Sequence, residues 1–270
     1  MTETLLSIKD LSITFTQYGR FLKPFQSTPI QALNLEIKKG ELLAIIGASG
    51  SGKSLLAHAI MDILPKNASV TGDMIYRGQS LNSKRIKQLR GKDITLIPQS
   101  VNYLDPSMKV KHQVRLGISE NSKATQEGLF QQFGLKESDG DLYPFQLSGG
   151  MLRRVLFTTC ISDKVSLIIA DEPTPGLHPD ALQMVLDQLR SFADKGISVI
   201  FITHDIVAAS QIADRITIFK EGKAIETAPA SFFSGNGEQL QTEFARSLWR
   251  SLPQQEFLKG VTHDLRDLRG

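Results

Sequence analysis

Eight residues from Gly47 to Ser54 form a glycine-rich loop with the composition of a phosphate-binding site. The loop consists of Gly47, Ala48, Ser49, Gly50, Ser51, Gly52, Lys53 and Ser54. Its glycines permit positive φ angles, so that successive backbone N–H groups can point at phosphate oxygens. Lys53 can bridge the β- and γ-phosphates of a nucleotide, and the Ser54 hydroxyl can ligate Mg²⁺. An apolar run at residues 42–46 precedes the loop and a helical pattern at 54–64 follows it, which is the context this motif requires.

Two adjacent carboxylates, Asp171 and Glu172, follow a second apolar run at residues 165–170. A buried strand ending there would hold Asp171 at the carboxyl edge of a parallel sheet, where open α/β sheets bind ligands. We expect Asp171 to orient Mg²⁺ through water and Glu172 to polarise the water that attacks the γ-phosphate. Alone, the pair would read as an ordinary acidic turn before Pro173. The phosphate loop upstream favours the catalytic interpretation.

Two more polar residues follow predicted strands. His204 comes directly after the apolar run at 198–203, so we expect it at the same sheet edge, where it can contact the γ-phosphate and orient the attacking water. Gln99 follows a short predicted strand at 94–97. Its uncharged amide can join the shell of Mg²⁺ and water while the following loop moves.

A second anion-binding turn lies between these motifs. It is formed by Ser148, Gly149 and Gly150 at the start of a helical pattern. The N–H groups and positive dipole end of such a helix can bind phosphate. Two phosphate-binding helix ends in one chain imply that one of them serves the ATP of a neighbouring subunit.

The elements that must position these residues alternate between strand and helix, which predicts an α/β fold with a mostly parallel sheet. At the N-terminus, residues 5–15 and 32–37 alternate as antiparallel strands do, and we expect a long loop between them. Residues 99–160 are mostly helical and polar, which predicts an inserted helical subdomain. An amphipathic helix is predicted over 181–193, and the C-terminal tail contains a helical candidate around Phe244, Leu248 and Trp249.

Composition narrows the function classes. The chain has 270 residues, of which 41% are hydrophobic, and its net charge is +3. Because the basic residues are spread along the chain rather than gathered in a block, nucleic-acid binding is not expected. One cysteine, Cys160, excludes an intramolecular disulfide. The five histidines also lack metal-ligand spacing; they are His58, His112, His178, His204 and His263. No targeting segment is recognised at the N-terminus, and no apolar run approaches the ~20 residues of a membrane span, so any membrane role is expected to come through partners.

The motifs occur in the order and spacing of ABC transporter ATPases, and this resemblance covers nearly the whole chain. Three features resemble the nickel and peptide uptake branch: the segment 147–151 with Met151 in place of the commoner Gln, the segment 103–106, and the tail 244–253. By overall similarity, the chain most resembles the ATPases that import nickel, cobalt and zinc as complexes of an opine-type metallophore such as staphylopine.

The resemblance implies a RecA-like P-loop ABC ATPase core with an N-terminal antiparallel β-subdomain, at residues 1–98 and 161–225. It further implies a helical signature subdomain at 99–160 and a short C-terminal extension at 226–270. The implied cofactors are ATP and Mg²⁺, with Ser54, Gln99 and Asp171 around the metal. The implied partners are a second ABC ATPase, expected to be a different chain and packed head to tail, two membrane permeases and a substrate-binding protein. The chain would then sit at the cytoplasmic face of the membrane.

The family also implies an aromatic residue that stacks on adenine. Phe15 is the first candidate, with Tyr18 next, and simple packing is the alternative for either. One position departs from the family pattern: His178 stands where an Asp is usual after Gly176 and Leu177. The substitution either reflects an asymmetric pair with a different partner ATPase or is simply tolerated.

Three rival functions are weighed against metal import. The first is a di- or oligopeptide importer, which the sequence does not separate from the main hypothesis. The second is a soluble ABC ATPase acting on ribosomes or DNA, which usually has two ATPase halves or a long coiled-coil insertion. The third is a small-molecule P-loop kinase, which would leave the turn at 148–150 without a purpose.

Overall fold

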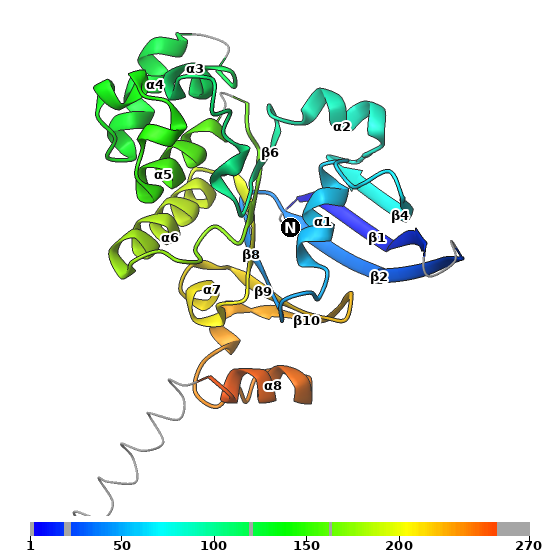
Figure 1. Ribbon diagram of the computed structural model, residues 1–270. Helices are drawn as coiled ribbons and strands as arrows, with labels where there is room; N and C mark the ends of the chain where they lie inside the picture. Colours follow the sequence, from blue (N-terminus) through cyan, green and yellow to red (C-terminus); the bar gives the residue numbers. More distant parts are fainter. Residues whose placement is uncertain (1–2, 19–22, 119–120, 162–163, 253–270) are drawn as a thin grey trace, which may run out of the picture.

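The computed structural model describes residues 3–18, 23–118, 121–161 and 164–252. Two sheets organise them (Figure 1). The first has the strand order β2-β1-β4-β5, and all of its pairs are antiparallel. Its strands are β1 (Thr4–Tyr18), β2 (Pro24–Lys38), β4 (Ala68–Tyr76) and β5 (Gln79–Ser80).

The second sheet has the order β10-β9-β3-β8-β7-β6 and is parallel except for β10. Its strands are β3 (Leu42–Ile46), β6 (Ile94–Ile97), β7 (Leu167–Asp171), β8 (Ser198–Thr203), β9 (Arg215–Lys220) and β10 (Lys223–Pro229). The α-helices are α1 (Lys53–Ile60), α2 (Ser83–Leu89), α3 (Val110–Arg115), α4 (Ser122–Gln132), α5 (Gly149–Thr159), α6 (Pro179–Asp194), α7 (Ile206–Ile212) and α8 (Glu243–Arg250).

The parallel sheet separates two apolar cores, and strand β3 contributes to both. Leu42, Ala44 and Ile46 belong to the core that includes α5 and α6, whereas Leu43 and Ile45 belong to the core shared with α1 and the antiparallel sheet. All five side chains are buried. This burial on both faces explains why the strand is a continuous apolar run rather than an alternating one.

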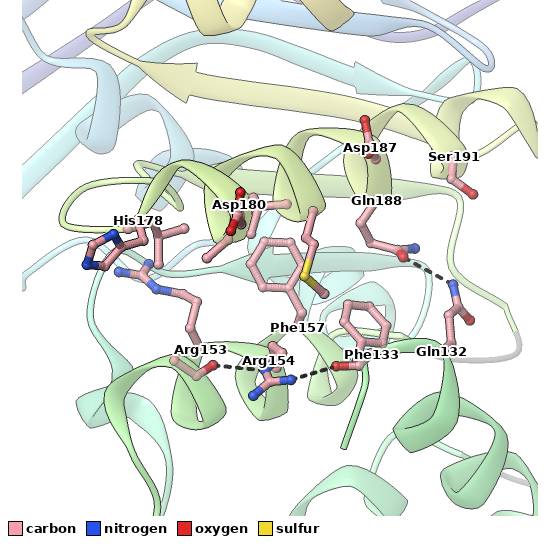
Figure 2. Close-up of a pocket in the computed structure, with 15 residues that line it drawn as sticks. Gln132, Phe133, Arg153, Arg154, Phe157, His178, Asp180, Asp187, Gln188 and Ser191 are labelled. Atoms are coloured by element: carbon pink, nitrogen blue, oxygen red, sulfur yellow. Dashed lines mark hydrogen bonds between the residues drawn. The ribbon is translucent and has the colours of Figure 1, made fainter. Parts of the chain in front are cut away.

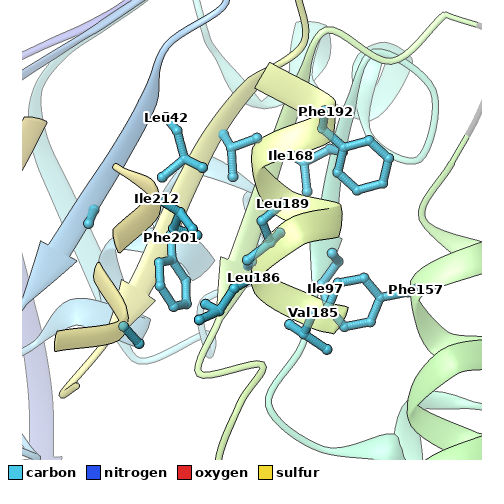
Figure 3. Packing of buried hydrophobic residues seen from close by; sticks show 14 of the residues in the cluster. Leu42, Ile97, Phe157, Ile168, Val185, Leu186, Leu189, Phe192, Phe201 and Ile212 are labelled. Atoms are coloured by element: carbon cyan, nitrogen blue, oxygen red, sulfur yellow. The ribbon is translucent and has the colours of Figure 1, made fainter. Parts of the chain in front are cut away.

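Helix α6 covers one face of this sheet. Figure 3 shows Leu186, Leu189 and Phe192 of the helix packed with strand residues such as Ile168 and Phe201. These helical positions recur at three- and four-residue spacing, so one stripe of α6 is buried while the opposite face is polar. The predicted helix over 181–193 is therefore present, and it begins two residues earlier and ends one residue later than predicted.

Helices α3, α4 and α5 form a group at one end of the molecule, on the far side of β6 from the antiparallel sheet (Figure 1). Short 3₁₀ segments connect them, at Val101–Tyr103, Glu137–Asp141 and Pro144–Gln146. The inserted helical region predicted from the sequence thus follows β6 and returns to the sheet at β7.

The prediction of a long loop between the two N-terminal strands was wrong. Strands β1 and β2 instead stay paired well beyond the predicted strand ends, as far as Tyr18 and Pro24. The extension is rich in threonine and aromatic residues, which favour strands, and a hydrogen bond of 3.0 Å joins the hydroxyls of Thr14 and Thr28 across it. Residues 19–22 lie outside the described residues.

The sequence analysis did not identify β4, α7, β9 or β10. Strands β9 and β10 form an antiparallel pair at the edge of the parallel sheet. The sequence analysis places the start of the C-terminal extension at residue 226, and this boundary falls inside β10. The predicted helix near Trp249 is present as α8, and the indole N–H of Trp249 donates to the carbonyl of Gly235 at 3.0 Å.

Candidate active site

The glycine-rich loop connects β3 to α1, as its motif requires. Gly52 is the N-cap of α1 and has a φ of 103°, a conformation that residues with a side chain rarely adopt. Gly47 is needed for a different reason, because a Cβ atom there would lie 2.3 Å from the carbonyl oxygen of Phe219 in β9. The backbone of the loop at Gly47 therefore packs so closely against β9 that only glycine fits there.

Lys53 begins α1 and is almost fully buried. Its Nζ donates to the carbonyl oxygens of Gly47 at 2.8 Å and Ala48 at 2.9 Å. Burial lowers the pKa of this ammonium group, and the nearby charges of Glu172 and Asp171 oppose that shift. The loop carbonyls thus fix the charged end of the lysine at the concave side of its own loop.

Ser54 and Asp171 meet although they lie 117 positions apart. The Ser54 hydroxyl donates to Oδ1 of Asp171 at 3.0 Å. Asp171 is buried at the end of β7, and burial raises the pKa of its carboxyl group, while the hydrogen bond from Ser54 and the charge of His58 pull it down. A hydroxyl and a carboxylate oxygen side by side form the donor set that Mg²⁺ prefers.

Glu172 and His204 also meet directly. The distance between Oε2 of Glu172 and Nδ1 of His204 is 2.7 Å. Glu172 has a φ of +47°, which is unusual for a residue with a side chain, and its backbone N–H donates to the carbonyl of Ile202 in β8 at 2.9 Å. The left-handed backbone and the bond to β8 turn the Glu172 side chain toward the residue that follows β8. Backbone strain of this kind clusters at functional sites.

Gln99 lies two residues beyond β6, and its side chain is exposed. Among the described residues no hydrogen bond joins this side chain to Ser54 or Asp171. The backbone carbonyl oxygen of Gln99 instead accepts a hydrogen bond of 3.2 Å from Nη1 of Arg153 in α5. The structure therefore links the Gln99 loop to the helix whose N-cap is Ser148.

Ser148, Gly149 and Gly150 are exposed at the start of α5. Ser148 is the N-cap, and its hydroxyl accepts from the N–H of Met151 at 3.3 Å. A Cβ atom added at either glycine would meet nothing within 4 Å. The turn thus faces open space and belongs to the helical group, whereas the phosphate loop belongs to the parallel sheet.

Of the two aromatic candidates, Phe15 is partly buried in β1 and packs against the core beneath the antiparallel sheet. It pairs with Ser27 of β2 and Ala68 of β4. Tyr18 is 69% exposed at the end of the same strand. Near the loop itself lies Ile30 of β2, which pairs with Ile13 of β1 and whose side chain would be 3.2 Å from a Cβ at Gly52.

His178 is the N-cap of α6, and its side chain makes no capping hydrogen bond. An Asp at this position would be a strong N-cap, because its carboxylate can accept from the first N–H groups of the helix. Figure 2 places His178 beside Arg153 at one end of a cavity between α5 and α6.

Sequence reasoning placed Glu172 and His204 at one sheet edge but missed the bond between them, because side-chain direction depends on the φ of Glu172. It also missed Arg153, whose only signal was a basic residue one helical turn into α5.

In the part of the chain that the structure describes, no group of three or more His, Cys, Asp or Glu residues could hold a metal ion. None of the described helices is both long and apolar enough to cross a bilayer.

Comparison with known proteins gives consistent relatives. The family model described as ABC transporter matches residues 30–175. The metal-staphylopine import system ATP-binding protein CntD of Staphylococcus aureus is 32% identical over 97% of this chain and 100% of its own length. The oligopeptide transport ATP-binding protein OppD of Bacillus subtilis is 33% identical over 83% of this chain and 65% of its own length. The glutathione import ATP-binding protein GsiA of Salmonella choleraesuis is 30% identical over 95% of this chain, which spans 43% of that relative.

Two solved structures have the same fold. A dimeric post-hydrolysis state of the ATP-binding cassette MJ0796, bound to ADP and Pi, has a TM-score of 0.73 and 24% identity, covering 84% of this chain and 99% of its own. CbiO1 of Clostridium perfringens, part of the ABC transporter complex cbiONQ, has a TM-score of 0.72 and 25% identity, covering 96% and 99%. The predicted P-loop cassette, with its antiparallel β-subdomain and helical insertion, is confirmed.

Proposed function

The chain belongs to the ABC transporter family and is an ATPase of the importer type, and from this premise we propose that it powers bacterial uptake of nickel, cobalt and zinc as metallophore complexes. The observation that supports this substrate is the alignment with CntD, which includes nearly all of this chain and all of that relative. In this proposal the chain lies at the cytoplasmic face of the membrane, bound to two permeases that are supplied by a substrate-binding protein.

The phosphate loop holds the nucleotide in this proposal. Backbone N–H groups between Gly47 and Ser54 surround the phosphates, and Lys53 supplies positive charge at the β- and γ-phosphates. The close approach of Gly47 to Phe219 supports this role, because it folds the loop into a cradle that a side chain would disrupt.

The residues present also fit Mg²⁺. Ser54 and Asp171 would hold the ion, directly or through water, with Gln99 in its outer shell, and the ion would neutralise charge on the β- and γ-phosphates. The hydrogen bond of 3.0 Å between Ser54 and Asp171 supports this fit, since it brings two hard oxygen ligands together in a partly buried setting.

Glu172 is proposed to polarise the attacking water, and His204 to orient both Glu172 and the γ-phosphate. The distance of 2.7 Å between their side chains supports a shared task. A carboxylate held by a neighbouring imidazole keeps one orientation, so it can accept a proton from water without first reorganising.

The turn at Ser148, Gly149 and Gly150 is proposed to bind the ATP of a second ABC ATPase packed head to tail. Its exposure at the N-terminus of α5 supports this, because its N–H groups are available to a neighbouring molecule. The partner is proposed to be a different chain. His178, the N-cap residue of α6 that makes no side-chain capping bond, is then one source of asymmetry between the two subunits.

A groove beside Gln99 is proposed as the permease docking surface. It is a hollow of about 500 Å³ between the sheet edge and the helical group. Three large apolar side chains in its lining are at least one-third exposed, namely Ile63, Tyr103 and Leu116. Apolar side chains in such a groove are well suited to receive an apolar segment of a permease. Movement of the Gln99 loop would then pass from the nucleotide to the membrane subunits.

The alternative substrate is a di- or oligopeptide, which the similarity to OppD and GsiA favours. Reconstitution separates the two substrates. The chain would be inserted into liposomes with its permeases and partner ATPase, and ATP hydrolysis measured after adding the binding protein with nickel–staphylopine or with dipeptides. Stimulation by the metal complex supports metal import, whereas stimulation by peptide alone assigns the transporter to peptides.

A further inference from the structure

A two-residue turn, Glu221 and Gly222, joins β9 to β10. Both residues have positive φ, 48° and 76°, as a tight hairpin turn requires. Arg77 and Gly78 form the corresponding turn between β4 and β5, with φ of 49° and 70°. Gly78 is exposed, and a Cβ there would meet nothing within 4 Å, whereas Gly222 is buried. The turn type therefore does not account for the close surroundings of Gly222.

Gly222 makes backbone hydrogen bonds with two other segments. Its N–H donates to the carbonyl of Ser51 in the phosphate loop at 3.0 Å, and its own carbonyl accepts from the N–H of Gln31 in β2 at 3.2 Å. A Cβ atom at position 222 would lie 2.0 Å from the carbonyl oxygen of Pro29. Such an overlap would push the turn away from both segments, so only glycine permits these two bonds.

The bond from Gly222 orients the peptide unit between Ser51 and Gly52. A trans peptide is planar, so the N–H of Gly52 points opposite to the carbonyl of Ser51 and hence away from the turn. Among the described residues this N–H has no hydrogen-bond acceptor, whereas the N–H of Ser51 donates to the carbonyl of Ala48 at 3.2 Å. Gly52 is also the N-cap of α1. Its free N–H is therefore a donor suited to a phosphate oxygen at the start of a helix.

The turn is itself held in place on two sides. β9 pairs with β3, the strand that leads into the phosphate loop. Lys220, the last residue of β9, lies over the ring of Phe244 in α8, with 4.3 Å between Nζ and the ring centroid. A group can position another one only if it is fixed itself, and these contacts fulfil that condition.

We propose that Gly222 is a positioning residue for nucleotide binding, because its N–H holds the Ser51 carbonyl so that the N–H of Gly52 is directed at a phosphate oxygen. The inference rests on the proposed role of residues 47–54 as the phosphate site. It adds that the β9–β10 turn, far from the loop in sequence, sets part of the donor geometry. A donor that is oriented in advance binds charge without first reorganising.

Binding of adenylyl imidodiphosphate with Mg²⁺ to the full chain tests the proposal, with Gly222→Ala as the variant. Isothermal titration gives the affinity. Nuclear magnetic resonance gives the shift of the Gly52 amide proton, which moves downfield when the N–H donates to a charged oxygen. Gly72→Ala is the matched control, since a Cβ there would lie 2.5 Å from the Asp10 carbonyl oxygen, also at positive φ, but between β4 and β1. Gly78→Ala controls for turn strain alone.

Gly222→Ala is expected to bind the analogue about tenfold more weakly, with a smaller Gly52 shift, since one hydrogen bond to a charged oxygen is misaligned. Gly72→Ala should lose stability but keep the affinity and the shift, and Gly78→Ala should keep both as well. Equal effects of the Gly222 and Gly72 substitutions on binding would overturn the proposal, as would binding to the unaltered chain without a Gly52 shift. Absence of saturable binding to the unaltered chain would instead overturn the proposed function, and this inference with it.

Hydrogen exchange in the unaltered chain is a second test, which does not depend on whether Gly222→Ala folds. The bound analogue should slow exchange of the Gly222 amide, because the peptide unit between Ser51 and Gly52 is then held from both sides. The Gly78 amide should exchange at the same rate with and without the analogue. Exchange at Gly222 that is unaffected by the bound analogue would overturn the proposal.

Discussion

At the residue scale, the candidate site depends on two hydrogen-bonded pairs of side chains, each of which joins segments that are distant in sequence. Ser54 meets Asp171 at 3.0 Å, and Glu172 meets His204 at 2.7 Å. The first pair is partly buried, since Asp171 is buried and Ser54 is not fully so, and it offers oxygen ligands, whereas His204 is mostly exposed and leaves the second pair open to solvent. This difference in exposure agrees with the proposed roles, in which Ser54 and Asp171 hold the metal of the metal–nucleotide complex, and Glu172 and His204 polarise and orient the attacking water.

Replacing Lys53 with Ala should weaken ATP binding by about 10- to 100-fold, because a charged hydrogen-bond donor contributes about 1.5–3 kcal/mol. Binding of a fluorescent ATP analogue to the purified chain measures this. Lys223→Ala is a suitable control, since it removes a lysine from the exposed start of β10. Unchanged affinity in Lys53→Ala would contradict the role given to the loop.

Glu172→Gln should bind ATP normally but hydrolyse it about 10²- to 10⁴-fold more slowly, because the amide cannot accept a proton from water. The amide can still bond to His204, so the fold should be preserved. Single-turnover hydrolysis in the assembled transporter is the measurement, and near-normal turnover there would remove Glu172 from its assigned role.

At the scale of elements, the loop is held in shape by its neighbours in the sheet. Gly47→Ala should destabilise the chain by about 1–3 kcal/mol and weaken ATP binding, since the new methyl group would overlap the Phe219 carbonyl and both strands are held by ladder bonds. Chemical denaturation measures the first effect. The control is Gly128→Ala in α4, where an added Cβ meets nothing and Ala should be equal or slightly more stable. Equal stability of the two variants would show that the close approach is unimportant.

A buried carboxylate ties the C-terminal segment to the sheet. Glu226 in β10 accepts hydrogen bonds from the N–H groups of Gln241 and Thr242 and from the Thr242 hydroxyl, at 2.6–2.8 Å. Burial alone would raise its pKa, but these three donors hold the pKa below its usual range. A carboxylate with a lowered pKa stabilises the fold above its unfolded-state pKa, and this stability is lost as the pH falls through the folded-state pKa.

Glu226→Gln should therefore lower the free energy of unfolding at neutral pH and should flatten its decline between about pH 5 and pH 3. Denaturation across that range is the test. Glu243→Gln, at an exposed position in the first turn of α8, is the comparison. A pH dependence in Glu226→Gln identical to that of the unaltered chain would show that other groups control acid stability.

At the scale of the whole molecule, the groove beside Gln99 is the proposed contact with the membrane subunits. Tyr103→Ser combined with Leu116→Ser should abolish copurification with the permeases, because both side chains are more than 60% exposed and would lose their apolar contact area. Nucleotide binding by the isolated chain should be unaffected. Phe25→Ser is the control, since it removes an apolar side chain that is 49% exposed on β2. Copurification that survives the double substitution would place the permease contact elsewhere.

Much of this architecture is readable from the sequence where a motif and a continuous apolar run coincide. β3 and β7 were predicted because burial on both faces makes them uniformly apolar, and the loop and the Asp171–Glu172 pair follow directly from those strands. The hairpin β1–β2 was misread because its polar residues lie on an exposed sheet face. The bonds Glu172–His204 and Arg153–Gln99 were not predictable, since they depend on backbone angles and on packing between segments that are distant in sequence.

The central claim is that ATP hydrolysis by this chain drives uptake of metal–metallophore complexes. The most direct measurement is uptake of labelled nickel, cobalt and zinc, with and without added metallophore, beside uptake of a labelled dipeptide. Cells lacking the chain would be compared with cells complemented by the unaltered chain or by Lys53→Ala. Our account predicts that metallophore-dependent metal uptake is lost and is restored only by the unaltered chain. Loss of dipeptide uptake with unchanged metal uptake would contradict it.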